Sequence, residues 1–165
     1  MTSIAAWKTA GSYFDFHGRQ IFFREDGRED APTLLLVHGL LSASWDYDLI
    51  WPELVKKYRV LTLDMLGFGF SDKPYRHNYK VVEQADIYDE LLRRCEVRDF
   101  HLFAHDYGVS VAQELMARDM ERNRTTKVLS LVLLNGGLFP ETHHRILWQS
   151  LLLSPVAFSC VRCRT

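Results

Sequence analysis

Hydrophobic positions along the chain follow two patterns: short apolar runs, and longer stretches in which apolar residues recur at helical spacing. The short runs lie at Thr33–Val37, Arg59–Leu63, Phe100–Ala104 and Val128–Leu134. An uninterrupted apolar run is typical of a strand that is buried on both faces, as in a parallel sheet. We therefore predict four such buried strands.

Helical spacing occurs in the stretches that separate and follow these runs. They are Trp45–Tyr58, Val81–Cys95, Val109–Met120 and Glu141–Leu153. In the second stretch the apolar residues form one face, made of Ala85, Tyr88, Leu91, Leu92 and Cys95. Pro52 lies inside the first stretch and is expected to kink or restart that helix.

Two further strands are predicted near the start of the chain, at Ser12–Phe16 and Arg19–Glu25, joined like a hairpin at His17-Gly18. Beyond them strands alternate with helices. This βαβ series predicts an α/β fold, with a mostly parallel sheet and helices on both of its faces. Because ligands bind at the carboxyl ends of the strands in such sheets, the residues that follow each strand are the candidates for chemistry.

Composition and charge exclude several classes of protein. The chain has 165 residues, enough for one domain, and its hydrophobic fraction of 47% is that of a protein with a buried core. The net charge is -1 without a basic stripe, so nucleic acid is not expected as a partner. The longest apolar stretch, residues 146–161, contains Gln149 and Pro155 and is shorter than the roughly 20 residues of a membrane span. We expect no membrane span and no signal peptide.

The cysteines do not indicate a cofactor. There are three, Cys95, Cys160 and Cys163, and an odd number without framework spacing argues against a disulfide scaffold. The last two form a C-x-x-C pair, but a tetrahedral zinc site needs four ligands and no second pair completes it. We expect neither a metal nor another cofactor.

Glycine, histidine and acidic residues follow the predicted strands. They are, in chain order, His38, Gly39, Asp64, Gly67, Gly69, His105, Asp106, Gly108 and Asn135. The third strand is the most informative, because a helix opens directly behind it and Ala104 and Gly108 lie two residues before and after Asp106. Small residues at these spacings are typical of a nucleophile elbow, in which strand and helix meet at a sharp turn.

Asp106 is therefore the candidate nucleophile. Aspartate before a helix can also act as an N-cap, but the small residues in register favour the elbow. A carboxylate is ionised at neutral pH and needs no base to attack an sp3 carbon, whereas water needs a general base to hydrolyse the resulting ester. The positive end of the helix dipole stabilises an anion at this position.

Backbone amides are the expected partners of the reacting group. In an elbow enzyme one oxyanion donor comes from the loop after the first buried strand, here Leu40, and the other from the residue after the nucleophile, here Tyr107. We expect His38 to shape its loop with Gly39, and we do not expect it to act as the base. His105 and Asn135 are expected to support the turn, with the His105 side chain pointing away from it.

Four segments carry a resemblance to a known family: HGLLSASWDY, DMLGFGFSDKP, AHDYGVSVAQEL and LNGGLFPETH. Together they resemble the α/β-hydrolase superfamily in its epoxide hydrolase and haloalkane dehalogenase branch, from Trp7 through Ser154. The resemblance implies that Asp106 is the nucleophile and that Leu40 and Tyr107 supply the backbone donors. Tyr107 departs from the tryptophan usual in that branch, which puts a role in holding halide in doubt.

The resemblance also implies what this chain lacks. In the family the lid, the last strands, the triad acid and the catalytic histidine come beyond the position of Thr165, and none of the seven histidines matches that one. We therefore expect residues 1–155 to form the N-terminal half of an α/β-hydrolase domain, catalytically incomplete, followed by a tail at 156–165. Full-length relatives imply the endoplasmic reticulum membrane, and the localisation of this chain stays open.

Two functions are compatible with these features. The first is a hydrolase of epoxide, carbon–halogen or ester bonds, whose small apolar substrate would require the rest of the domain. The second is a non-catalytic interaction or regulatory fragment, which could also self-associate through the sheet edge exposed at Leu134. A lipase-like acyl hydrolase is disfavoured because the elbow carries aspartate instead of serine.

Overall fold

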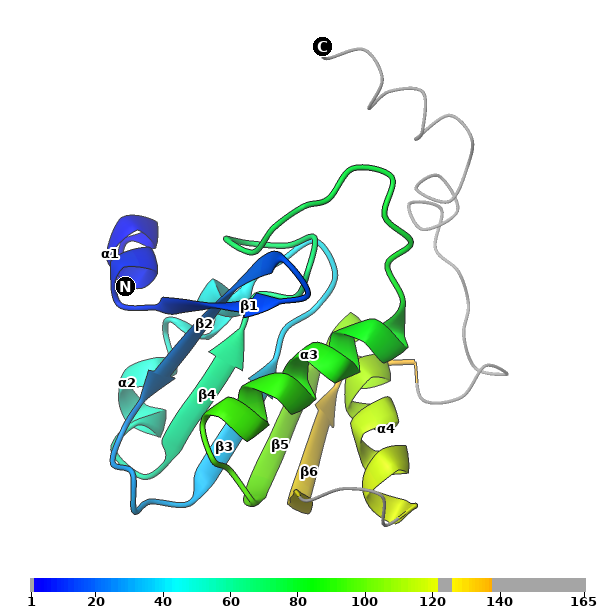
Figure 1. The fold of residues 1–165 in the computed structure, drawn as a ribbon. Coiled ribbons are helices and arrows are strands. Elements are labelled where there is room, and N and C mark those ends of the chain that lie inside the picture. Colours follow the sequence, from blue (N-terminus) through cyan, green and yellow to red (C-terminus); the bar gives the residue numbers. More distant parts are fainter. Residues whose placement is uncertain (1, 122–125, 138–165) are drawn as a thin grey trace.

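A six-stranded sheet in the order β1-β2-β4-β3-β5-β6 forms the centre of the protein. The computed structural model describes residues 2–121 and 126–137 (Figure 1). The strands are β1 (Ser12–Phe16), β2 (Arg19–Asp26), β3 (Thr33–Val37), β4 (Arg59–Leu63), β5 (Asp99–His105) and β6 (Lys127–Leu134). The helices are α1 (Ile4–Thr9), the 3₁₀ helix η1 (Ser44–Tyr47), α2 (Trp51–Leu54), α3 (Val81–Arg94) and α4 (Tyr107–Met120).

The chain begins its sheet with a tight hairpin. β1 and β2 pair antiparallel, and the last pair of the register is Phe16 with Arg19. The two residues between them, His17 and Gly18, have φ angles of 51° and 78°. Positive φ at both central positions is the requirement of a type I′ turn, whose twist matches that of paired strands. The predicted hairpin is confirmed.

The centre of the sheet is parallel, as predicted. β3 lies between β4 and β5 and is parallel to both, and β6 extends the sheet parallel to β5. Only β2 runs in the opposite direction, because it pairs antiparallel with both β1 and β4. Helices α3 and α4 cover one face of the sheet, while α2 lies behind the other (Figure 1). The predicted α/β fold with helices on both faces is confirmed.

Two hydrophobic clusters hold these layers together, one on each face. On β3 the alternation of side chains sends Leu35 and Val37 into the larger cluster with α3 and α4, and Leu36 into the smaller one. The smaller cluster also contains Trp7 and Trp51, whose rings meet edge to face at 5.1 Å. The sequence pattern missed helix α1, although Trp7 is 1% exposed and anchors that helix to the sheet.

The prediction for Trp45–Tyr58 is confirmed in part: Pro52 restarts a helix as expected, whereas one continuous helix over the stretch is wrong. The structure divides this stretch into η1 and the four-residue α2, with Pro52 in the first turn of α2. Proline has no N–H and is tolerated only in the first turn, so a helix that enters from before Pro52 cannot continue through it. Pro52 restarts the helix here, and α2 ends at Leu54.

The prediction that Val128–Leu134 is buried on both faces is also wrong. β6 pairs with β5 on one side only, and within the described residues its other edge has no strand beside it. Leu129 is 50% exposed and Val132 46% exposed. An apolar run indicates that a strand could be buried, but the position of that strand in the sheet decides how much of its surface is covered. The predicted helix at Glu141–Leu153 lies outside the described residues.

Candidate active site

Asp106 lies at the turn from β5 into α4, in a conformation that few residues adopt. Its φ is 53° and its ψ is -121°. A non-glycine residue with positive φ is strained, and such strain is concentrated at functional turns. Asp106 is the N-cap residue of α4, yet its side chain makes no capping hydrogen bond. The carboxylate is therefore directed at something other than its own helix.

Its partner is the backbone of the loop after β3. The Leu40 N–H donates to Asp106 Oδ2 at 2.8 Å. The main chain of Asp106 is held as well, because its N–H donates to the Leu134 carbonyl at 2.9 Å and its carbonyl accepts from the Val109 N–H at 3.0 Å. These contacts fix the turn between β6, α4 and the loop after β3, and among the described residues no hydrogen bond engages Asp106 Oδ1.

Two glycines make this close approach possible. A Cβ added to Gly39 would lie 2.9 Å from Asp106 Oδ2, and one added to Gly108 would lie 2.5 Å from the Val37 carbonyl oxygen and 2.6 Å from that of His38. Contacts under about 3 Å are repulsive for carbon, so a larger residue at either position would push the strand ends apart from the elbow. Gly39 and Gly108 thus set the distance between the carboxylate and the loop that binds it.

The other predicted supporting residues surround the turn. Tyr107 begins α4, and an amide in the first turn of a helix has no partner within that helix. Its half-buried ring packs against the core, and burial raises the pKa of its hydroxyl. His105 Nδ1 lies close to Gly39, 3.2 Å from the position of an added Cβ, so this ring borders the loop instead of pointing away from it. Asn135 follows β6 with a φ of 52°.

His38 is fully buried beneath the same loop. Its Nδ1 lies 2.8 Å from the Gly39 carbonyl oxygen, and its Nε2 accepts a hydrogen bond from the Met65 N–H at 2.9 Å. Burial lowers the pKa of the imidazole, an effect that the Gly39 carbonyl and the nearby Asp64 carboxylate partly oppose. Both ring nitrogens of His38 are therefore engaged within the protein interior.

A second loop, after β4, supports the first. Its Gly67 and Gly69 are predicted to form a tight turn that backs the site, and both have positive φ. The buried Asp64 carboxylate accepts from the Ser44 N–H and the Phe70 N–H, both at 2.7 Å. A Cβ on Gly69 would lie 2.0 Å from this carboxylate, and the φ of Gly69 is 49°. Its position directly after a buried strand placed Asp64 among the candidates of the sequence analysis, but did not predict that it would bind these two backbone amides.

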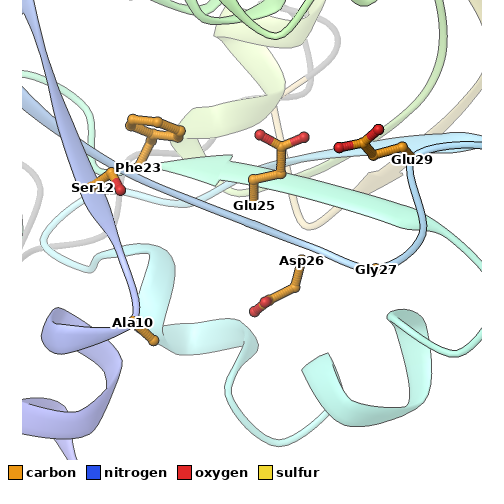
Figure 2. A pocket seen from close by; sticks show the side chains of 7 residues that line it. All are labelled: Ala10, Ser12, Phe23, Glu25, Asp26, Gly27 and Glu29. Atoms are coloured by element: carbon orange, nitrogen blue, oxygen red, sulfur yellow. The ribbon is translucent and has the colours of Figure 1, made fainter.

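Two pockets within the described residues lie away from Asp106. One of about 350 Å³ is lined by Ala10, Ser12, Phe23, Glu25, Asp26, Gly27 and Glu29. Figure 2 shows the Asp26 carboxylate directed away from those of Glu25 and Glu29, so the acidic side chains do not converge. Asp26 pairs with Val60 at the start of β4, whereas Asp106 follows the end of β5. This pocket is therefore at the opposite end of the parallel strands from Asp106.

Two features are absent from the described part of the chain, a metal-binding cluster and a membrane-spanning helix. Within residues 2–121 and 126–137, no group of three or more histidine, cysteine or acidic side chains is arranged to hold a metal ion. Over the same residues no helix is long and apolar enough to cross a membrane.

A parallel sheet flanked by helices, with an elbow behind its third parallel strand, is the arrangement of the α/β-hydrolases, and the chain belongs to this family. Residues 32–158 match the family described as alpha/beta hydrolase fold. The matched region contains the loop of His38, the elbow of Asp106 and the strands that place them.

Particular relatives are the mesoderm-specific transcript proteins. The one from Mus musculus is 43% identical over 93% of this chain and 49% of its own length, so the chain spans about half the length of the curated relatives it matches. A haloalkane dehalogenase from Bradyrhizobium diazoefficiens is 31% identical over 61% of this chain and 32% of its own length. The crystal structure of Cfl2 from Burkholderia cenocepacia has the same fold, with a TM-score of 0.76 at 24% identity over 92% of this chain and 54% of its own.

Proposed function

We propose that Asp106 is the nucleophile of a hydrolase that forms an alkyl ester with its substrate. The observation that carries the proposal is the strained elbow, in which Asp106 does not cap its helix and instead receives the Leu40 N–H on Oδ2. An N-cap aspartate would bond to the first turn of its own helix. An anion that is held by one oxygen, with the other unengaged, is arranged for attack through that other oxygen.

The first step is an in-line displacement at an sp3 carbon. Asp106 Oδ1 forms a bond to the carbon, and the electron pair of the breaking bond leaves with halide or with the oxygen of an epoxide, which then takes up a proton. The carboxylate requires no base for this step because it is ionised at neutral pH. The product is an ester whose carbonyl oxygen is Asp106 Oδ2.

The geometry also suits the second step. When water attacks the ester carbon, negative charge develops on Oδ2, the atom that the Leu40 N–H already contacts. An amide that is in place before the reaction stabilises this charge without reorganisation. The Tyr107 N–H, in the unpaired first turn of α4, is the expected second donor. Activation of the water requires a general base, and none of the described residues is assigned that role.

We expect a small apolar substrate with an epoxide, carbon–halogen or ester bond. The dehalogenase relative supports the carbon–halogen case, and the exposed Leu40 and Leu41 beside the nucleophile are apolar. The half-buried phenol ring of Tyr107 packs against the core, and a tyrosine has no indole N–H to offer a departing halide. In an epoxide the leaving oxygen remains attached to the substrate, so no halide has to be bound. Epoxides are therefore tested beside alkyl halides.

The experiment is covalent labelling of the purified chain. Styrene oxide and 1-bromobutane are each incubated with the protein, and intact mass spectrometry with peptide mapping locates the adduct. We expect one adduct, on Asp106, that is absent from Asp106→Asn and retained in Asp46→Asn, which removes an exposed carboxylate of η1. Equal labelling of Asp106→Asn would rule the proposal out. Repeated release of diol or butanol would show that the chain itself supplies the base.

A second candidate function is binding through the sheet edge. It is favoured by β6, whose exposed side chains include Leu129, Leu131, Val132 and Leu134. A row of unpaired backbone groups beside exposed apolar side chains is a template for another strand. This candidate predicts association without any requirement for Asp106, so Asp106→Asn separates the two functions.

A further inference from the structure

One peptide unit, between Gly39 and Leu40, is held at both of its ends. Its N–H, on Leu40, donates to Asp106 Oδ2 at 2.8 Å. Its carbonyl oxygen, on Gly39, accepts from the Ser42 hydroxyl at 3.1 Å and lies 2.8 Å from His38 Nδ1. We propose that His38 and Ser42 are positioning residues that aim the Leu40 N–H at the nucleophile by fixing the opposite end of the same peptide. This inference rests on the proposed role of Asp106.

The planarity of the peptide makes such remote control effective. In a trans peptide the C=O and N–H bonds point in opposite directions and rotate as one rigid plane. Any rotation that releases the Gly39 oxygen from Ser42 and His38 therefore turns the Leu40 N–H away from Asp106. Gly39 has no side chain to restrain the plane, and the space for one is filled by Asp106 itself. The two hydrogen bonds to the carbonyl supply that restraint.

The loop that contains this peptide also has a strained backbone. Leu41, directly after the clamped peptide, has a φ of 56°. A leucine in the left-handed region is strained and persists only where neighbouring contacts over-determine it. The Ser42 hydroxyl bond closes the loop across Leu41, back to Gly39. It therefore holds both the strained residue and the peptide plane before it.

We call the two hydrogen bonds from His38 and Ser42 to the Gly39 carbonyl the clamp. His38 can donate to this carbonyl only if its proton is on Nδ1, and the structure explains why the proton is there. The Met65 N–H can only donate, and it lies 2.9 Å from Nε2, so Nε2 must be the acceptor nitrogen. In a neutral imidazole the proton is then on Nδ1, which faces the Gly39 carbonyl. The loop after β4 thus sets the tautomer through Met65, and the tautomer in turn sets the peptide of the loop after β3.

Nuclear magnetic resonance tests the clamp without any substrate. In protein labelled with 15N, we expect the His38 imidazole to be protonated on Nδ1 alone. Exchange of the Leu40 amide proton with solvent should accelerate by about tenfold or more in Ser42→Ala, the loss of one modest hydrogen bond. The Asp64 amide, which donates to the Phe22 carbonyl of the sheet, should exchange as in the parent chain and reports that the fold is intact. Protonation on Nε2, or an unchanged Leu40 rate, would overturn the proposal.

Two substitutions at His38 separate the clamp from simple packing. Asn places its amide nitrogen near the position of Nδ1 and can still donate to Gly39, whereas Gln places its oxygen near Nε2 and can still accept from Met65. We expect Leu40 exchange to be faster in His38→Gln than in His38→Asn. The reverse order would mean that the Met65 contact, and not the donation to Gly39, governs the loop.

The rate at which Asp106 is labelled tests whether the clamp matters for reactivity. With styrene oxide, Ser42→Ala should lower the saturating rate of adduct formation on Asp106 by about tenfold while the half-saturating concentration stays unchanged, because orientation of the nucleophile is lost and not substrate binding. Ser42→Thr, which keeps the hydroxyl, should restore the rate. An unchanged saturating rate would overturn the clamp. If the parent chain forms no adduct, the role of Asp106 fails instead, and the exchange results still judge the clamp independently.

Discussion

The Leu40 N–H and the Asp106 carboxylate are hydrogen-bonded at 2.8 Å although 66 residues separate them in the chain. The contact exists because β3 and β5 are parallel neighbours, with Val37 opposite Ala104, so their carboxyl ends open at one edge of the sheet. The loop after one strand therefore meets the elbow after the other.

Gly108→Ala should destabilise the protein by about 1 to 3 kcal/mol, the usual cost of overpacking. The new methyl would lie 2.5 Å from the Val37 carbonyl oxygen, which belongs to the backbone and cannot rotate away. Urea unfolding measures the free energy. Gly18→Ala is the matched control, because Gly18 has a φ of 78° but nothing within 4 Å, so only conformational strain of about 1 kcal/mol arises. Labelling of Asp106 should fall in Gly108→Ala and stay unchanged in Gly18→Ala.

Gln84→Leu should cost about 2 to 4 kcal/mol, since two buried backbone groups lose their partners at once. The fully buried Gln84 amide accepts from the Leu66 N–H and donates to the Leu66 carbonyl, both at 3.0 Å. It thus joins α3 to the loop after β4. The control is Gln113→Leu on the exposed face of α4, which should change the unfolding free energy by less than about 0.5 kcal/mol. Similar values for the two variants would contradict a structural role for Gln84.

His38 is buried without a charge, so acid should destabilise the folded protein. The free energy of unfolding should decrease as the pH falls below about 6.5, the ordinary pKa of histidine. Burial lowers the pKa of His38 in the folded state, despite the opposing effects of the Gly39 carbonyl and of Asp64 and Asp46. Between the two pKa values the unfolded chain binds a proton that the folded chain does not, so the free energy of unfolding rises with pH there. One such group contributes at most about 1.4 kcal/mol per pH unit.

Urea titrations at pH 7.5 and pH 5.5 check this prediction. His38→Asn cannot titrate in that range, so its loss of stability between the two values should be smaller than that of the parent chain. An equal loss in both proteins would assign the acid sensitivity to other groups.

Replacement of an apolar side chain on β6 by lysine should reduce self-association. Leu131 is 36% exposed on the outermost described strand, and a charge on an edge strand opposes pairing with a second copy. Sedimentation velocity over a range of concentrations compares Leu131→Lys with Met120→Lys, which alters a 78% exposed residue of α4. We expect only the first variant to shift the distribution toward monomer. A parent chain that is monomeric at every concentration would refute association through this edge.

Much of this protein could be predicted from local pattern alone. The apolar run Thr33–Val37 became β3 with the predicted bounds, and the predicted face of α3 is buried at Ala85, Tyr88, Leu91 and Leu92. The spacing of Ala104 and Gly108 around Asp106 predicted a sharp turn from a strand into a helix, and β5 turns into α4 at that position. That Asp106 is a nucleophile there stays a proposal. Each of these predictions depends on residues that are neighbours in the chain.

Tertiary structure decided whatever depends on residues far apart in the chain. The exposure of β6 follows from its place at the edge of the sheet, and the burial of Trp7 follows from the face that α1 happens to meet. The hydrogen bonds of His38, Ser42 and Leu40 depend on how two loops approach one elbow. No periodicity encodes such distances. They are set by the order of parallel strands and by the two glycines that allow the backbones to touch.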